Sequence, residues 1–552
     1  MRGESNYWKT MAKERLTRRQ VLGGAARAGL GLAGLSLLGC AAAPAATPTK
    51  APAAAGTPTA VKPQYGGKII GAAEATPGMD PGSNLAGSHD DLLKNHIYNG
   101  LVGLTVKGEY VPDLAESWEN PDKTTFIFKL RRGVKFHDGT DFNAQTLKEG
   151  FYDRYTSGQK VHRTPPQFAK EKIIKSWDSV DDYTVKISLE KVFASFFYQN
   201  VAARSGGFVA SPTALKKQNN DLTTQGVGTG PFTAGDWVLD DRVSLKKFPG
   251  YWEKDLPYLD EIVWRIIPDQ NTAINMLRIG DINLILTVLV KDASLLESDP
   301  NVVVRKVPGS KRKTLSFNMV RPPFDKLANR QAVAYAIDRK ALADAVWQGF
   351  YPPGDGPFPP SSWAYDPNLK GYPYDPAKAK EKLAEAGNPE GFTVTTAAAT
   401  GRPDEITMSE VIQAQLAKVG IKLNIRTMDN ATWTKARDKG IEEFQMMSSS
   451  TGSSDEPGYL YYVEYSRFGR TDFYRVENKE MEALYWKSEE SYNLEERRPY
   501  LQELAKLITR DVWSFLILAY PFNIYAYRKG VNDTELGTNY TDIRLKKAWL
   551  SK

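Results

Sequence analysis

The stretch ITMSEVIQAQLAKVGIKLNIRTM, residues 406–428, carries the clearest fold signal in this 552-residue chain. Its first part has the composition of a helix that stops at Gly420, and the part that follows alternates apolar and polar residues as a strand does. A helix that leads directly into a strand is typical of α/β layering. The stretch therefore predicts an α/β fold for the region around it.

Further helices are expected in the second half of the chain. Residues 327–349 place their apolar side chains close to one face and predict a single helix that ends at a glycine. Residues 375–387 predict a second helix, with Asp375 as the N-cap and Gly387 as the stop. Helix-rich sequence therefore dominates after about residue 310.

Strands are expected mainly before residue 310. Four stretches combine alternation with β-branched residues, and no internal repeat relates them. They are TTFIFKLRRGVKF (124–136), DYTVKISLE (182–190), DRVSLKKF (241–248) and LDEIVWRIIP (259–268).

The sequence lacks the common signatures of enzymes. It has no GxSxG nucleophile elbow, no HExxH and no phosphate loop, and its four histidines fit no metal-ligand spacing. His137 precedes Asp138 and Gly139, a hairpin-turn signal that favours a structural role. We therefore expect no catalytic residues, no metal site and no cofactor.

The N-terminal region has the layout of a secretory signal. A basic segment that ends at Arg19 precedes an apolar, glycine-rich stretch, whose uninterrupted part, residues 28–39, is too short to span a bilayer. Residues 37–39 look like a bacterial lipobox before Cys40, the single cysteine of the chain. We expect residues 1–39 to be removed and Cys40 to become a lipid-modified N-terminus, although an ordinary signal peptide is the alternative.

Two features flank this site. Arg18 and Arg19 resemble the pair in a twin-arginine export signal, and general secretion stays open as the alternative. Residues 40–65 begin at Cys40 and are otherwise mostly Ala, Pro and Thr, which predicts an extended tether rather than a domain.

The net charge is +7 for the whole chain but falls when the signal is removed, which argues against nucleic acid as a partner. Residues 1–39 hold seven basic and two acidic residues, so the mature chain carries +2. No mature basic stripe with interleaved aromatic residues stands out, and no later segment is long and apolar enough to cross a membrane. The membrane contact that we expect is the lipid anchor.

Seven stretches in order along the chain share a pattern with a known family. They are IYNGLVGL (97–104), VPDLAESWE with FIFKLRRGVKFHDGT (111–140), GTGPF (228–232), PGYWEKDLPYLDEIVWRIIPD (249–269), RPPFDKLANRQAVAYAIDRKAL (321–342), AYDPNLKGYPYDPAKAKEKLAEAG (364–387) and FNIYAYRKGV (522–531). Together they resemble the extracytoplasmic solute-binding proteins of the peptide and nickel class, which feed ABC importers.

The resemblance implies a two-lobed periplasmic-binding-protein clamp of the type II-like class, with an additional domain inserted in the first lobe. By analogy, lobe I comprises residues 66–101, 206–310 and 520–552. The inserted domain comprises residues 102–205, and lobe II comprises residues 311–519.

The function implied is that of the lipid-anchored, extracytoplasmic substrate-binding component of an ABC importer. A solute bound between the lobes shifts an open-to-closed equilibrium, and the permease subunits recognise the closed form. No covalent step is needed, and we expect a monomer. A surface-anchored hydrolase and a signalling solute sensor are the alternatives.

Eight residues are predicted ligand contacts, and five of them lie outside the stretch 444–462. Trp433 lies where relatives place an aromatic ring in the pocket, with packing within the lobe as the alternative. Trp363 and Tyr365 lie on a proline-rich loop. Asn318 follows the first strand expected to cross between the lobes, where it either binds the ligand or braces the backbone. Tyr98 has the same ambiguity, with burial favoured.

The ligand class depends on the stretch FQMMSSSTGSSDEPGYLYY, residues 444–462. In peptide-binding relatives the corresponding stretch has a Trp and, three residues later, an Asp that pairs with the α-ammonium group of the ligand. Alignment on Glu456 and the following proline puts Ser450 at the Trp and Ser453 at the Asp. A hydroxyl group cannot neutralise a buried ammonium group, so ordinary peptide binding is in doubt.

Asp455 could replace that missing carboxylate if the loop is shifted by two residues. Otherwise the serines, together with Tyr459, favour a hydroxylated neutral ligand such as an oligosaccharide. Peptide, oligosaccharide and nickel chelate all stay open as ligands.

Overall fold

The computed structural model places most of the chain after the predicted tether. It describes residues 62–82, 90–156, 173–202, 207–400, 402–429, 432, 433, 435, 436, 444–451, 456–466, 477–539 and 542–551. Gln64–Lys552 form one compact unit. The predicted signal, including Arg18 and Arg19, and the predicted lipidation site Cys40 lie outside the described residues.

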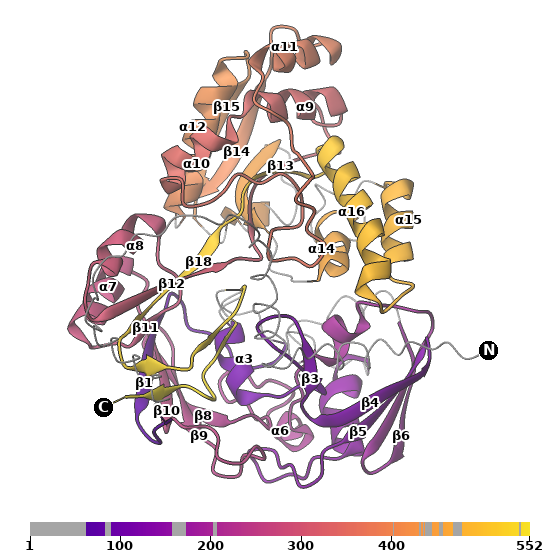
Figure 1. Cartoon of the computed structure of the whole chain (residues 1–552), viewed down its shortest axis with the longest axis vertical. Coiled ribbons are helices and arrows are strands. Elements are labelled where there is room, and N and C mark those ends of the chain that lie inside the picture. The colour runs from indigo at the N-terminus through magenta and orange to yellow at the C-terminus, as the bar shows by residue number, and fades with distance from the viewer. Residues whose placement is uncertain are drawn as a thin grey trace, which may run out of the picture. The chain divides into compact units, whose positions relative to one another are not determined.

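A seven-stranded mixed sheet organises the first lobe (Figure 1). Its strands in spatial order are β12 (Val302–Pro308), β18 (Phe522–Arg528), β11 (Leu284–Ile285), β1 (Lys68–Ala73), β10 (Glu261–Ile266), β9 (Arg242–Lys247) and β8 (Phe232–Val238). β1 is parallel to β10 and β11, and the other pairs are antiparallel. The helices of this region are α3 (Asp91–Ile97), α6 (Pro212–Lys217), α7 (Gln270–Ile279) and α8 (Val290–Glu297).

A five-stranded sheet organises the second lobe. Its strands in order are β15 (Lys422–Met428), β14 (Thr393–Ala399), β16 (Met446–Thr451), β13 (Arg312–Phe317) and β17 (Phe515–Ala519). The helices are α9 (Leu327–Ala336), α10 (Arg339–Trp347), α11 (Pro376–Glu385), α12 (Pro403–Ala417), α14 (Pro457–Glu464), α15 (Lys479–Ser488) and α16 (Leu494–Arg510). β14 is parallel to β15, as a strand–helix–strand unit requires.

A separate four-stranded antiparallel sheet has the order β4 (Ala115–Asp122), β5 (Thr125–Leu130), β7 (Thr184–Leu189) and β6 (Ile174–Asp181). Short elements surround it: β2 (Val102–Leu104), β3 (Tyr110–Pro112), α4 (Ala144–Leu147), the π-helix η2 (Lys148–Asp153), α5 (Arg154–Thr156) and the π-helix η4 (Phe197–Val201). Near the C-terminus lie β19 (Val531–Asn532), β20 (Glu535–Leu536), β21 (Ile543–Arg544) and β22 (Trp549–Leu550).

The chain passes from one large sheet to the other at two neighbouring places. β12 leads through Gly309 into β13, and β17 leads through Pro521 into β18. The two crossings are antiparallel partners, and the Gly309 amide donates to the Pro521 carbonyl over 3.0 Å. A Cβ atom at Gly309 would come within 2.6 Å of that carbonyl oxygen, so this close approach requires glycine.

We refer to these two crossings, residues 309–311 and 520–521, as the crossing ribbon. Figure 1 shows β12 and β18 rising side by side toward β13. Sheet membership thus changes close to the predicted limits of lobe II. The limits of the lobes and of the inserted domain themselves stay predictions.

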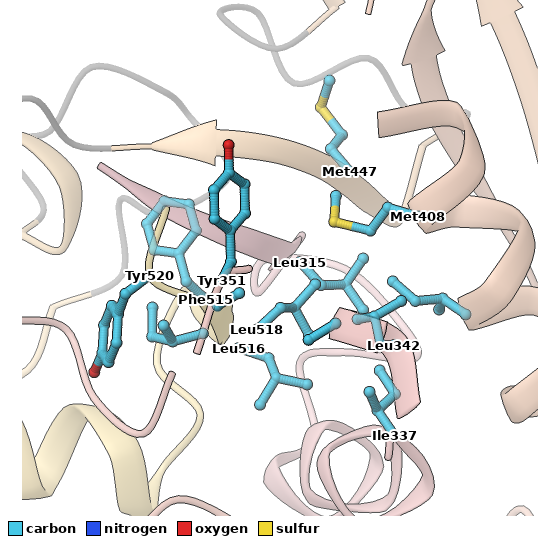
Figure 2. Close-up of a cluster of buried hydrophobic side chains, with 14 of the residues drawn as sticks. Leu315, Ile337, Leu342, Tyr351, Met408, Met447, Phe515, Leu516, Leu518 and Tyr520 are labelled. Carbon is cyan, nitrogen blue, oxygen red and sulfur yellow. The ribbon is translucent and has the colours of Figure 1, made fainter. Parts of the chain in front are cut away.

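The core of the second lobe packs on both sides of its central strands (Figure 2). Leu315 of β13 is fully buried between the neighbouring strands, which contribute Met447 and Leu516. Met408 of α12 lies next to Met447, and Leu342 of α10 closes the cluster. This apolar packing fixes the end of β13 that leaves the crossing ribbon.

The prediction of one helix over residues 327–349 was wrong, because the chain forms α9 and α10 instead. The break comes at Asp338, whose side chain accepts a hydrogen bond from the Ala341 amide over 2.9 Å. An aspartate that caps a new helix competes with continuation of the old one. The cap predicted at Asp375 is confirmed, since its side chain accepts from the Lys378 amide.

His137 lies in a tight turn, as its sequence predicts, although the strand before it ends at Leu130 rather than residue 136. The Phe136 amide donates to the Thr140 carbonyl, and Gly139 has a φ of 85°. The imidazole lies between the backbones of Gly228 and Gly230, and burial lowers its pKa to about 4. These contacts support the structural role that the sequence favoured.

Candidate ligand-binding site

The crossing ribbon places two lysines at the start of the second lobe. Lys311 directly precedes β13, and Lys313 follows two positions later, so their side chains leave the same side of the chain. Arg312 between them is fully buried and donates to the Pro357 carbonyl and to Glu464. The buried arginine anchors this part of the chain and thereby fixes the backbone positions of Lys311 and Lys313.

The N-terminus of α12 brings the opposite charges to these lysines. Pro403 begins the helix, and Asp404 and Glu405 occupy its first turn, where carboxylates interact favourably with the helix dipole. Lys313 donates to Asp404, which is an ion pair between the two elements. Arg402, the residue before the helix, is one-third exposed and faces Glu405.

Glu405 is almost completely buried, with 3% of its surface exposed. Its Oε1 accepts from the Ser450 amide at the end of β16 over 3.1 Å. Its Oε2 lies 3.6 Å from Arg402 Nη1 and makes no hydrogen bond with any residue that the structure describes. Half of this carboxylate is therefore available to a further donor.

The electrostatic environment includes one residue of the first lobe. Glu74 follows β1 and acts on Lys311 together with the charges of the second lobe. We refer to these six charged residues as the ribbon cluster. Its members are Glu74, Lys311, Lys313, Arg402, Asp404 and Glu405.

The pKa values in the ribbon cluster follow from burial and like or opposite charges. Burial, with Lys313 and Arg402 nearby, lowers the pKa of Lys311 to about 8. Burial acts in the same direction on Lys313, but Asp404 and Glu405 outweigh it and raise the pKa of that lysine. Burial also raises the pKa of Glu405, although the cations oppose it. Lys311 and Lys313 therefore have pKa values shifted in opposite directions.

Trp433 lies behind this cluster. Its indole ring is 1% exposed, and the Arg402 guanidinium lies 4.3 Å from the ring centroid. The face of the ring is thus covered by Arg402, which is the more exposed of the two residues. The predicted contact between Trp433 and a ligand stays a prediction, and the structure brings Arg402 in front of it.

Trp363 and Tyr459 belong to a second group of residues. It lies where the segment after β7 meets α14, α15 and α16. Four polar residues there are Ser195, Glu456, Glu489 and Arg497, which we refer to as the seam cluster. The Arg497 guanidinium lies 5.1 Å from the Trp363 ring, and the Tyr459 ring lies 6.0 Å from that of Tyr198.

Asn318, Tyr98 and Tyr365 each contact residues that are not members of the ribbon cluster. Asn318 is at the opposite end of β13 from the crossing ribbon, and its side chain accepts from the Val320 amide, which is a bracing role. Tyr98 is buried in the core of the first lobe against Phe208. Tyr365 packs edge-on against Tyr520. Their roles in binding are not tested by these contacts.

Ser453 and Asp455, on which the ligand class depends, lie outside the described residues. Ser450 and Glu456 flank them. The Ser450 amide donates to Glu405 of the ribbon cluster, and Glu456 is a member of the seam cluster. The segment between them therefore connects the ribbon cluster to the seam cluster along the chain.

Sequence reasoning missed Lys311, Lys313, Arg402 and Glu405. Their stretches, GSKRKT and GRPDE, have charges that resemble an ordinary solvated loop. Their positions in the chain could have indicated a site. GSKRKT lies at the expected crossing between the lobes, and GRPDE precedes and begins the helix of the α/β unit.

Two features are absent from the part of the chain that the structure describes. No group of three or more His, Cys, Asp or Glu side chains there is arranged to hold a metal ion. Within the same ranges, no helix combines the length and the apolar run that a membrane span needs.

A family model described as "Bacterial extracellular solute-binding proteins, family 5 Middle" matches residues 109–469. The chain belongs to this family. The resemblance to solute-binding proteins of the peptide and nickel class is thereby confirmed. Family 5 is a family of binding proteins, so the expectation that the chain is not an enzyme is confirmed as well, and the hydrolase alternative is excluded.

Relatives of this family 5 protein include the glutathione-binding protein GsiB of Escherichia coli (strain K12). It is 36% identical over 367 residues, which cover 65% of this chain and 70% of GsiB. Other strains of Escherichia and Shigella have the same binding protein at 35–36% identity.

Solved structures confirm the two-lobed α/β fold class. The periplasmic binding protein DppA of Helicobacter pylori, in complex with the peptide STSA, has a TM-score of 0.77 and 29% identity and covers 89% of this chain and 99% of its own. AgaA of A. tumefaciens R10, in complex with agropinic acid, has a TM-score of 0.76 and 25% identity and covers 88% and 99%.

Proposed function

We propose that this family 5 protein binds a peptide-like solute with free carboxylate and ammonium groups, and delivers it to the permease of an ABC importer. The ribbon cluster carries the proposal, because it sets three cations against three carboxylates where the two lobes meet. A ligand with both kinds of charge can pair with both kinds of side chain. The relatives that bind glutathione and a peptide support the same ligand class.

The cations of the cluster suit the carboxylate of the ligand. Arg402 is one-third exposed, and the Trp433 ring holds its guanidinium in place. A fixed guanidinium can make two parallel hydrogen bonds to one carboxylate. Lys311, in the crossing ribbon, adds a second positive charge, and burial lowers its pKa to about 8. We assign the binding of the ligand carboxylate to Arg402 and Lys311.

The ammonium group is assigned to Glu405. Its Oε2 lacks a hydrogen bond among the described residues, and a charged donor there would satisfy it. This assignment answers the doubt that the serine at position 453 raised, because a carboxylate from α12 replaces the one missing from the loop. Asp455 stays a second candidate for the same role.

Calorimetry on the purified protein tests this ligand class. The probes are glutathione, a tetrapeptide with free termini, its amidated and acetylated forms, and a neutral oligosaccharide. We expect micromolar binding of the free peptides and weaker binding of both blocked forms. Arg402→Ala should lower the affinity for the free peptide roughly 10- to 100-fold. Lys418→Ala, an exposed residue at the other end of the same helix, is the matched control.

Two outcomes would contradict the proposal. Binding of the oligosaccharide without binding of any peptide would make the ligand neutral and hydroxylated. Equal affinity for the free and amidated peptides would remove the carboxylate from the recognition.

The proposed location is the outer face of the cell membrane. We infer that Cys40 is the lipid-modified N-terminus and that residues 41–65 tether the lobes near the permease, where the tether raises the local concentration of the protein. Cys40→Ser should move the protein from the membrane fraction to the soluble fraction. Retention of the variant in the membrane fraction would contradict the anchor.

A further inference from the structure

The seam cluster is a nearly dry group of polar residues from two distant parts of the chain. Ser195 comes from the segment between β7 and the π-helix η4, and the other three members come from α14, α15 and α16 or the residues next to them. Their exposed fractions are 0% for Ser195, 5% for Glu456, 0% for Glu489 and 3% for Arg497.

Glu489 is the link between the two sides. One carboxylate oxygen accepts from the Ser195 amide over 2.7 Å, and the other accepts from the Ser195 hydroxyl over 2.8 Å. The Glu489 backbone carbonyl accepts from the Ala194 amide over 3.0 Å. Three hydrogen bonds therefore join residues that are 294 or 295 positions apart in the sequence.

Arg497 holds the two carboxylates of the second lobe together. It donates to Glu456 over 2.6 Å, to Glu489 over 3.2 Å and to the Ser488 carbonyl over 2.8 Å. A Cβ atom at Gly458 would lie 2.3 Å from Glu489 Oε1, so a larger residue there would displace this carboxylate. The second lobe thus presents Glu489 in a fixed position.

Further contacts flank the seam cluster on the same interface. The Lys191 ammonium group lies 3.4 Å from the centroid of the Trp486 ring. The Tyr492 hydroxyl donates to the Lys123 carbonyl over 3.0 Å, and its ring packs edge-on against Phe126. The four-stranded sheet and its flanking segments therefore contact α15 and α16 over a broad seam.

The covalent connections put this contact at the free ends of a hinge. The four-stranded sheet follows β1 along the chain before the first crossing, and α14–α16 lie between the two crossings. A rotation about the crossing ribbon would separate Ser195 from Glu489 without breaking either sheet. Water would then have to replace the three hydrogen bonds.

We propose that Ser195 and Glu489 form a latch that holds the four-stranded sheet against the second lobe and sets the fraction of ligand-free protein in the closed conformation. The latch lies outside the ribbon cluster, to which the proposed function assigns the charged groups of the ligand, so it acts through closure. It rests on the two-lobed clamp mechanism of the proposed function, but not on the identity of the ligand. Because only the closed form binds fully, the latch also sets the apparent affinity.

The closed fraction of ligand-free protein tests the latch. Spin labels on Lys175→Cys of β6 and Lys380→Cys of α11, both exposed, in a Cys40→Ser background report the distance across the interface. Ser195→Ala removes the hydroxyl donor, and Lys191→Ala removes the contact to Trp486. We expect each variant to lower the ratio of closed to open molecules roughly three- to tenfold. Ser176→Ala, whose hydroxyl donates to Asp178 of its own strand, should leave the ratio unchanged.

The affinity for glutathione gives an independent readout. We expect the two latch variants to bind it more weakly, through faster dissociation, by the same factor as the loss of closed molecules. Closed fractions in both latch variants that equal that of Ser176→Ala would overturn the proposal. The distance measurement needs no ligand, so its result stands even if glutathione and peptides fail to bind.

Discussion

The ribbon cluster and the seam cluster contain the same kinds of charged groups in different environments. In the seam cluster, Arg497 is 3% exposed and donates to two carboxylates and a backbone carbonyl. In the ribbon cluster, Arg402 is one-third exposed and lies 3.6 Å from a carboxylate oxygen that has no hydrogen bond among the described residues.

The difference indicates that the charged groups of the seam cluster stabilise the fold, whereas those of the ribbon cluster are suited to binding a ligand. Buried ions that the protein satisfies fully resist any change, because removal of one member leaves the others unpaired. Ions that stay partly exposed and partly unsatisfied retain the capacity to pair with something else. Removal of a charged group should therefore affect mainly stability in the seam cluster and mainly affinity in the ribbon cluster.

The largest expected effect comes from Arg497→Met. The variant leaves the carboxylates of Glu456 and Glu489 buried without their cation, which should lower the free energy of unfolding by about 3–5 kcal/mol. Urea denaturation measures this. The neighbouring Arg498→Met removes a partly exposed arginine and should cost less than about 1 kcal/mol. Equal losses for the two variants would contradict the distinction between satisfied and exposed ions.

Glu405→Gln should show the opposite behaviour in the ribbon cluster. The variant keeps the shape of the side chain, and an amide oxygen can still accept from Ser450, so we expect little change in stability. Loss of the negative charge should lower the affinity for a peptide with a free ammonium group roughly tenfold. Calorimetry with the free and the acetylated peptide measures it. An equal loss for both peptides would show that Glu405 does not contact the ammonium group.

The pH dependence of binding should depend on Lys311. Burial lowers the pKa of this lysine to about 8 in the ligand-free protein, and a ligand carboxylate would raise that pKa. Binding should then take up a proton, be strongest below pH 8 and weaken several-fold as the pH rises through that value. Lys311→Arg, which stays charged, should lose this pH dependence. A wild-type affinity for glutathione that stays constant over the same range would contradict the assignment.

The smallest effect is expected for Trp433→Phe. The indole supports Arg402 from behind, and phenylalanine gives a weaker cation–π contact, so the affinity should fall only about twofold. Tryptophan fluorescence on addition of glutathione gives a second measurement, with Trp237→Phe in the first lobe as the control. A variant that keeps the full ligand-induced signal would remove Trp433 from the site.

Local features of the fold could be predicted from the sequence because neighbouring residues determine them. Asp375 before Pro376 caps its helix as expected, and the helix–strand unit at residues 406–428 forms, with its helix starting at Pro403. Asp338 shows the limit of this reasoning. The apolar periodicity continues across it, and the side chain interrupts the helix by capping the next one.

The two clusters could not be predicted in the same way. Ser195 and Glu489 are 294 positions apart, and nothing in either local sequence points to the other. Lys311 and Arg402 look like solvated charges until the fold brings the start of β13 to the N-terminus of α12. Trp433 was found only through family resemblance, and its position behind Arg402 depends on how the two side chains pack.

The narrowness of the crossing ribbon determines the mechanics of the protein. Gly309 and Pro521 bring the two crossings within one hydrogen bond, so the pivot has the width of only two chains. Figure 1 shows α15 and α16 well away from β12 and β18. A small rotation at the pivot would therefore become a long displacement at the seam, so each hydrogen bond there opposes opening with a long lever arm.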